Sequence, residues 1–162
     1  MNKFVPNTAG VNQDREYFIK ENTFVKIDTV VDRGKNEALI LSSISHPNIQ
    51  KYVNSYLEEG KHFLETEYFD GETLENLNLN GEQVNKVESQ LMEVLSYLIK
   101  KQVTHGDINV SNILFNGESI LIIDWETSSK GDALSDLFGP EYPTKHCGII
   151  NVIRIIREGV LG

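Results

Sequence analysis

The feature that most constrains the fold of this chain is a long apolar stripe in its second half. The stripe recurs at three- and four-residue spacing, and its members are Val84, Val87, Leu91, Val94, Leu95, Leu98 and Ile99. Such spacing places these side chains on one face of an α-helix, and that face must be buried against another layer of the molecule. The sequence therefore predicts a long helix over residues 84–99 that packs on one side.

The residues before this helix are typical of short strands interrupted by one helix. The turn-like pair Glu21-Asn22 separates two strand-like runs, which predicts a hairpin, and His46-Pro47-Asn48 stops the helix that follows. Two more strands come next. The expected elements in this half are strands at 16–20 and 23–28, a helix at 32–44, and strands at 50–57 and 62–69.

The residues after the long helix read as a loop, a strand pair and two short helices. Asn116-Gly117 marks the turn of the strand pair, and Ile149, Val152, Ile153 and Ile156 give the last helix an apolar face that should pack on the second half of the chain. The expected elements here are a loop at 104–112, strands at 113–115 and 119–123, and a last helix at 148–158.

Three polar residues around this strand pair suggest a chemistry. Asp107 and Asn112 lie five residues apart in the loop, and Asp124 follows the apolar run Leu121-Ile122-Ile123. Transfer of a phosphoryl group from ATP needs one group that orients the attacking hydroxyl and at least two oxygen ligands for Mg²⁺. An alternative is that Asp107 and Asn112 cap their own loop and Asp124 caps a strand end. The combined spacing favours a phosphoryl-transfer site.

The order of these residues resembles that of the protein-kinase-like superfamily, and the resemblance runs across nearly the whole chain. It implies an α+β bilobal fold. The N-terminal lobe (1–70) would be a small antiparallel sheet with one helix and would end in the hinge, and the C-terminal lobe (71–162) would be shortened and mainly helical. Gly71 and the asparagine-rich residues 76–80 mark the composition change at this boundary.

The resemblance also implies roles for the loop residues. Asp107 would position the substrate hydroxyl, and Asn112 and Asp124 would hold Mg²⁺. His105 would brace the loop rather than transfer protons. Asp136, further along, either supports this loop or caps a helix, and both readings stay open.

In the first lobe, the resemblance implies a nucleotide site. Lys26 would contact the α and β phosphates of ATP and be held by Glu37, and backbone groups near Glu67 and Phe69 would bind the adenine edge. Each assignment has an alternative. The alternative for Lys26 is a solvated lysine on a strand. The alternative for Glu37 is that the helix dipole favours a glutamate early in a helix, without any ion pair. The assignment of the hinge depends on backbone groups, and the side chains of a sequence say little about where such groups lie.

Several departures narrow the resemblance. Gly106 replaces the arginine that reads a phosphorylated activation loop in regulated protein kinases, so such regulation is not expected. Asp124-Trp125-Glu126 stands in place of Asp-Phe-Gly, and no Ala-Pro-Glu segment follows. The first 25 residues hold only Gly10 where a glycine-rich phosphate loop would lie. These features are similar to aminoglycoside phosphotransferases, choline-kinase-like enzymes and minimal atypical kinases.

Composition and charge limit the kinds of partner that the chain is expected to bind. The net charge of -9 and pI near 4.9 argue against nucleic acid, which is bound mainly through Lys and Arg. Cys147 is the only cysteine and has no internal disulfide partner, and the N-terminus lacks an apolar signal-peptide core. No run approaches the roughly 18 apolar residues of a membrane span. A cytoplasmic protein is expected.

The sequence thus predicts an ATP- and Mg²⁺-dependent phosphotransferase that acts on the hydroxyl of a small molecule or sugar. The alternatives are a minimal serine/threonine protein kinase and a nucleotide-binding scaffold with weak or no activity. Only 38 residues follow Asp124 (125–162), so a protein partner that completes the acceptor site is also considered.

Overall fold

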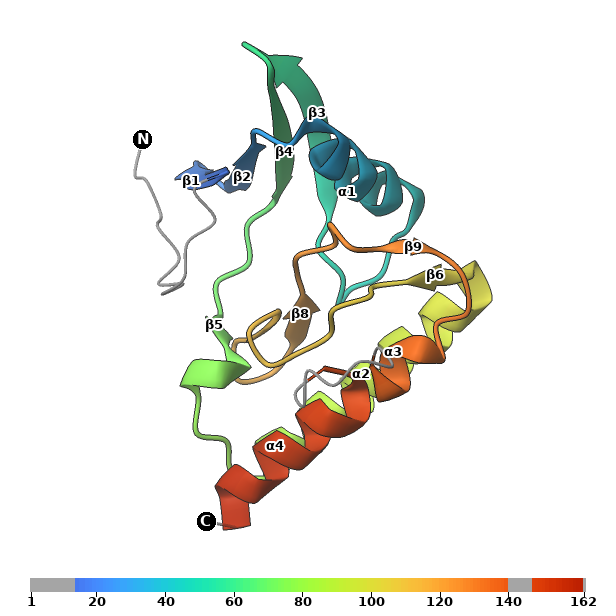
Figure 1. Cartoon of the computed structure of the whole chain (residues 1–162). Coiled ribbons are helices and arrows are strands. Elements are labelled where there is room, and N and C mark those ends of the chain that lie inside the picture. The colour runs from blue at the N-terminus through green and yellow to red at the C-terminus, as the bar shows by residue number, and fades with distance from the viewer. Residues whose placement is uncertain (1–13, 140–146, 162) are drawn as a thin grey trace.

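The computed structural model describes residues 14–139 and 147–161, and its first half is an antiparallel sheet flanked by one helix (Figure 1). The sheet has the order β1-β2-β4-β3. Its strands are β1 (Arg15–Lys20), β2 (Thr23–Asp28), β3 (Tyr52–Glu58) and β4 (Lys61–Glu67). The predicted hairpin is confirmed, because β1 and β2 pair antiparallel from Arg15 opposite Asp28 to Lys20 opposite Thr23.

Helix α1 (Val31–Ser43) packs on this sheet. Asp28 starts the helix by accepting the backbone N–H of Val30 and pairing with Arg33. Gly34 faces His62 of β4, and a Cβ at Gly34 would lie 2.6 Å from the Nδ1 atom of that ring. A glycine here therefore lets the helix approach the sheet closely.

The long predicted helix is α2 (Gly81–Lys101). It begins with a capping box in which Asn80 and Gln83 each accept the other's backbone N–H. Six of the seven predicted stripe residues are buried, but Ile99 is 41% exposed. Ile99 follows Leu98 directly, so it is rotated by about 100° from it and falls at the edge of the buried face.

Short strands connect the two halves of the molecule. The predicted pair is β7 (Ile113–Phe115) and β8 (Ile120–Ile122), and β5 (Glu72–Thr73) adds to β7 just before the 3-10 helix η1 (Leu74–Asn76). Strand β6 (Val103–Thr104) pairs with β9 (Ser129–Lys130). Patterns of periodicity did not predict β5, β6 and β9, because two residues are too few to show one.

The Asn48 segment fastens the first half of the chain to β8. Ile49 forms a parallel bridge with Ile122, and the Asn48 side chain donates to the carbonyl of Ile120 at 2.9 Å. Gln90 of α2 accepts from both Asn48 and the Ile120 N–H. The residues that stop α1 thus also join it to the scaffold beneath the predicted site.

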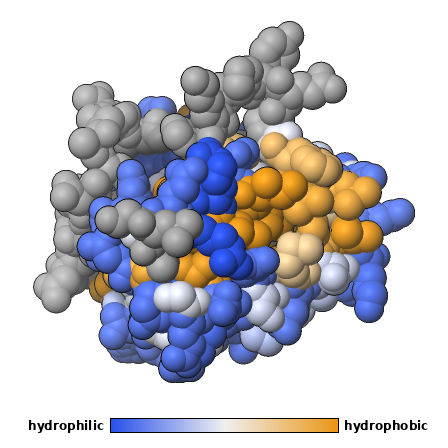
Figure 2. Space-filling model, turned by 90° about the horizontal axis from the view of Figure 1, so that it is seen from below, coloured by the Kyte–Doolittle hydropathy of each residue, from blue (hydrophilic) through white to orange (hydrophobic). Residues whose placement is uncertain are grey.

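Helices α3 (Ser135–Phe138) and α4 (Ile149–Leu161) follow, and α4 lies along α2 (Figure 1). Ile149, Val152 and Ile156 are buried, as the predicted apolar face requires. Seen from below, this end also carries an exposed hydrophobic patch (Figure 2), and Ile150 of α4 is 46% exposed. Among the described helices, none combines the length and apolar character needed to cross a bilayer.

Candidate active site

His105 supports the loop between β6 and β7 from beneath. Its ring is fully buried, and Nδ1 accepts the backbone N–H of Asp107 at 3.0 Å. The proton is therefore assigned to Nε2, which donates to the carbonyl of Ile123 at 2.9 Å. The ring also meets Trp125 edge-on, with centroids 4.6 Å apart. Because both ring nitrogens are engaged, His105 joins the Asp107 loop to the residue before Asp124.

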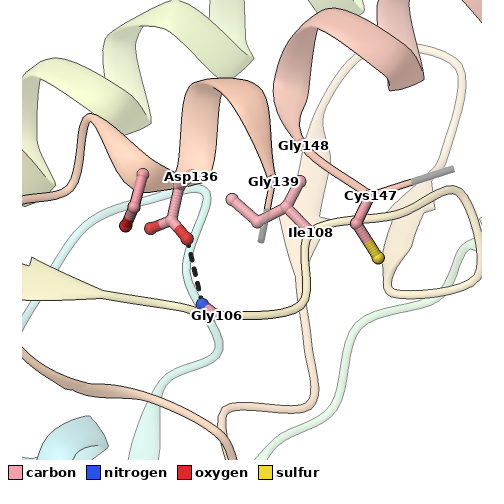
Figure 3. Close-up of a pocket in the computed structure, with 7 residues that line it drawn as sticks. Gly106, Ile108, Asp136, Gly139, Cys147 and Gly148 are labelled. Atoms are coloured by element: carbon pink, nitrogen blue, oxygen red, sulfur yellow. Dashed lines mark hydrogen bonds between the residues drawn. The ribbon is translucent and has the colours of Figure 1, made fainter. Parts of the chain in front are cut away.

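Asp136 holds the same loop from the other side. Its two carboxylate oxygens accept the backbone N–H groups of His105 at 2.8 Å and Gly106 at 2.9 Å. Figure 3 shows the second of these bonds, from Gly106. The side chain is buried, whereas the exposed Asp132 accepts the Leu134 N–H at the start of α3. Of the two readings that the sequence left open for Asp136, loop support is the correct one.

Gly106 is required by the backbone path. Its φ is 91°, and a Cβ would lie 2.8 Å from the carbonyl oxygen of Thr127. Side chains rarely adopt this φ, and the close backbone approach leaves no room for one. The arginine of regulated kinases therefore has no place in this loop conformation.

Neutral donors surround the carboxylate of Asp107. Asn109 donates to Oδ1 at 3.0 Å and Asn112 donates to Oδ2 at 3.1 Å. Asn112 also donates to the Asp107 carbonyl at 2.9 Å, and the Cys147 thiol lies 3.3 Å from Oδ1. Neighbouring side chains thus fix the orientation of this carboxylate without a formal charge.

A small pocket borders this loop where α3 and the start of α4 meet it (Figure 3). Its volume is about 150 Å³, below the roughly 300–1,000 Å³ of typical ligand pockets. It is lined by Gly106, Ile108, Ser135, Asp136, Gly139, Cys147 and Gly148. The pocket is too small for a nucleotide.

Asp124 and Asn112, the predicted metal ligands, come from adjacent segments. The Ile123 N–H donates to the Asn112 carbonyl at 2.9 Å, and Asp124 follows in the left-handed region at φ 64°. Because the Asn112 amide nitrogen is used by Asp107, its side-chain oxygen remains available as a ligand. Within the described residues no group of three or more His, Cys, Asp or Glu forms a metal site. A Mg²⁺ ion does not need such a group of protein ligands, because it keeps several waters and binds one or two protein oxygens plus phosphates.

Lys26 lies at the centre of a buried charge cluster. Its Nζ is 2.8 Å from Glu37 Oε1, 3.3 Å from Asp124 and 3.2 Å from Glu126. Burial disfavours its charge, but Glu37 and Asp124 outweigh burial and raise the pKa of Lys26. The predicted ion pair with Glu37 is present, and the alternative of a solvated strand lysine is wrong.

Helix α1 is tied to the segment after Asp124. The second oxygen of Glu37 accepts the Trp125 N–H at 2.8 Å. Beside it, the Asn36 amide donates to the carbonyls of Glu126 at 3.2 Å and Ser128 at 2.9 Å. The fold therefore positions Lys26, Glu37 and Asp124 as one unit.

The carboxyls of Asp124 and Glu126 respond in opposite ways to this cluster. Burial alone would raise the pKa of Asp124, but Lys26 and Arg15 lower it overall. Burial raises the pKa of Glu126, and the neighbouring Asp124 raises it further. The two cations therefore dominate at Asp124, whereas burial and the neighbouring carboxylate dominate at Glu126.

The predicted hinge residues follow β4. The Glu67 N–H donates to the Lys51 carbonyl at 2.9 Å, and the Tyr68 N–H donates to the Asn22 carbonyl at 2.9 Å. Within the described residues the Phe69 N–H has no hydrogen-bond partner. Contacts of Glu67 and Phe69 with adenine stay a prediction, and Gly10 lies outside the described residues.

Sequence reasoning missed several residues around the site. Arg15 pairs with Glu126 across 111 positions, a separation that no local pattern indicates. Asn109 and Cys147 contact Asp107, and Asn36 fastens α1. The one available signal was Glu126, whose charge directly follows Asp124-Trp125 in a buried stretch.

A sheet with one packed helix, a buried lysine–glutamate pair, and an aspartate after β8 beside a His-Gly-Asp loop define a kinase-like fold. A family model described as "Protein kinase domain" matches residues 7–148. The chain belongs to the protein kinase domain family.

The chain is also similar to parts of several curated proteins, two of them named as kinases. The chain is 32% identical over 117 residues to spermatocyte protein spe-8 of Caenorhabditis elegans, covering 68% of this chain and 23% of that protein. It is 27% identical over 99 residues to the probable serine/threonine-protein kinase YbdM of Bacillus subtilis, covering 57% and 39%. Calcium-dependent protein kinase 5 of Plasmodium berghei is 32% identical over 109 residues, covering 62% and 19%. The chain thus matches well under half the length of these relatives.

Proposed function

We propose that this chain is an ATP- and Mg²⁺-dependent phosphotransferase that moves the γ-phosphoryl group to a hydroxyl. The observation that carries the proposal is the convergence of Lys26, Glu37 and Asp124 in one buried cluster. The Asp107 loop is joined to that cluster through Ile123. Phosphoryl transfer depends mainly on positioning and charge, and this arrangement provides both.

Each residue has a proposed role. Asp107 accepts a hydrogen bond from the acceptor hydroxyl and orients it, while Asn112 and Asp124 hold Mg²⁺. Lys26 binds the α and β phosphates, and the backbone near Glu67 and Phe69 binds adenine. Bound Mg²⁺ neutralises charge on the phosphates. His105 transfers no proton, because both of its nitrogens hold the loop.

The proposed acceptor is a small hydroxyl compound or sugar. Only residues 131–134 separate β9 from α3, so no long segment after Asp124 is present there to hold an extended peptide. The backbone at Gly106 also excludes the arginine that reads a phosphorylated loop. Both observations favour a compact acceptor and activity without loop phosphorylation.

A second candidate is a minimal serine/threonine protein kinase. It is favoured by the printed names of relatives such as the kinases of Bacillus subtilis and Plasmodium berghei. The two candidates share the same nucleotide site and differ only in the acceptor.

Nucleotide binding is tested first. ATP with Mg²⁺ should raise the melting temperature of the full chain, because a ligand of the native state stabilises it. Lys26→Met should lose this shift, and the surface variant Glu82→Gln should keep it. No shift in the wild-type protein at millimolar nucleotide would contradict the proposal.

Transfer is tested with γ-labelled ATP against panels of hydroxyl compounds and proteins. Label on small molecules supports the first candidate, and label on protein alone supports the second. Nucleotide binding without any transfer would leave a nucleotide-binding scaffold.

A further inference from the structure

Glu126 occupies both cations of the candidate nucleotide site. One oxygen of its carboxylate is 2.5 Å from Arg15 Nη2 and the other is 3.2 Å from Lys26 Nζ. The Arg15 and Glu126 side chains are 8% and 13% exposed. A single side chain therefore bridges the lysine proposed to bind phosphate and an arginine that no kinase motif in this sequence assigned.

Arg15 still has binding capacity to spare. Its Nε is buried and has no hydrogen-bond partner among the described residues. A guanidinium offers five N–H donors in a planar fork that matches carboxylate and phosphate oxygens alike. The same face of Arg15 that now holds an anionic side chain is suited to a phosphate.

We propose that the Glu126 carboxylate is an internal stand-in for nucleotide phosphate, and that Arg15 is a second phosphate-binding residue alongside Lys26. This inference rests on the proposed nucleotide site. When nucleotide binds, its phosphates replace the carboxylate on both cations, so Glu126 competes with nucleotide and weakens its affinity. The carboxylate also repels the incoming phosphates.

The exchange requires little movement of the chain. The Trp125 N–H is fixed by Glu37, and the carbonyl of Glu126 is held by Asn36. Only the side chain of Glu126 has to rotate away, while the backbone of the segment stays in place. Asp124, two residues before Glu126, keeps its contact with Lys26 and remains available to metal.

The test compares nucleotide dissociation constants with and without Mg²⁺, read from the fluorescence of Trp125, the single tryptophan of the chain. Calorimetry on the same samples gives an independent value. Glu126→Gln should bind ATP about tenfold more tightly even in EDTA, the effect of losing one competing charge pair. Arg15→Gln should bind about tenfold more weakly, and its loss should persist in the double variant Arg15→Gln/Glu126→Gln.

Two matched variants control for general charge effects. Glu118→Gln removes the partner of Lys86 on the surface, and Arg157→Gln removes the partner of Glu88 on the surface. Both should bind ATP as the wild-type protein does. Melting curves taken first show that each variant is folded, and Arg15→Gln tests the inference independently if Glu126→Gln does not fold.

The outcomes separate this inference from the proposed function. If the wild-type protein binds ATP and Glu126→Gln binds it equally, or more weakly only with Mg²⁺, Glu126 is not a phosphate stand-in and the inference is overturned. If Glu126→Gln alone binds measurably, the inference is supported. If neither protein binds, the proposed nucleotide site fails and the inference fails with it.

Discussion

The two aspartates of the candidate site, Asp107 and Asp124, are held in contrasting ways. Asp107 is fixed by neutral donors, and those on its own loop lie within five residues of it. Asp124 is fixed by the cation of Lys26, 98 positions away, in a cluster that includes two further carboxylates. One side of the site is a short local network, and the other is a buried network of opposite charges.

This contrast indicates which property a mutation on each side of the site should change. Removing one neutral hydrogen-bond donor from a loop costs the protein little stability, provided that no buried group is left unpaired. A buried charge that loses its partner costs far more, because it must stay desolvated without compensation. We therefore expect changes at Asp107 to affect transfer and changes at Lys26 to affect stability as well.

The largest effect is expected for Asp107→Asn. The variant should lose transfer by about 10²–10⁴-fold, the range for a positioned acid–base group, because the amide cannot orient the hydroxyl in the same way. Nucleotide affinity should stay within about twofold of wild type, since Asp107 does not contact the Lys26 cluster. Single-turnover transfer and a thermal shift with ATP measure the two quantities. Unchanged turnover would remove Asp107 from the mechanism.

Lys26→Met should destabilise the fold by about 3–5 kcal/mol, because it leaves buried Glu37 without a cation. Urea unfolding at pH 7 measures the loss. The double variant Lys26→Met/Glu37→Gln should recover part of the stability, because it removes the unpaired charge. Equal stability of the single and double variants would mean that the two halves of the site do not differ in the way described.

Asp136→Ala tests the support of the Asp107 loop. The buried His105 N–H that it leaves unpaired should cost about 1–3 kcal/mol, and the part-buried Gly106 N–H should add a smaller loss. Asp132→Ala, in the turn just before α3, removes one exposed hydrogen bond to the Leu134 N–H and should cost only about 1 kcal/mol. Chemical denaturation of both variants ranks them. A smaller loss for Asp136→Ala than for Asp132→Ala would contradict the loop-support role.

The smallest effect is expected from pH. Burial lowers the pKa of His62, so the unfolded chain binds a proton there more readily than the folded protein. The stability from neutral His62 is fully present above its unfolded pKa of about 6.5 and is lost as pH falls toward the folded value. Melting temperatures at pH 7.5 and 5.5 should show a decrease that His62→Gln makes smaller. An identical decrease in the variant would assign the effect to other groups.

The sequence was sufficient to predict the parts of this molecule that depend on periodicity and short-range spacing. The hairpin follows from the turn-like pair Glu21-Asn22. Helices α2 and α4 follow from the repeat of apolar residues, and the approach of Asn112 to Asp107 follows from their five-residue spacing. Lys26 and Glu37 were placed by resemblance, and their pairing is seen at 2.8 Å.

Contacts between segments that are distant in the chain could not be predicted from the sequence. The Arg15–Glu126 pair joins two residues with no pattern in common, and Asp136 could equally have capped its own helix. The left-handed backbone at Gly106 was likewise invisible, because a glycine in a sequence does not reveal its φ. These features depend on how the chain packs in three dimensions rather than on local propensity.

The attachment of α1 through Asn36 and Glu37 has a consequence for inhibitor design. A compound that needs space between α1 and residues 125–128 would have to break three hydrogen bonds to backbone groups before it could enter. A compound confined to the proposed adenine site near Phe69 would not have to break these three hydrogen bonds. Selective inhibitors of this chain should therefore be sought among compounds that leave α1 in place.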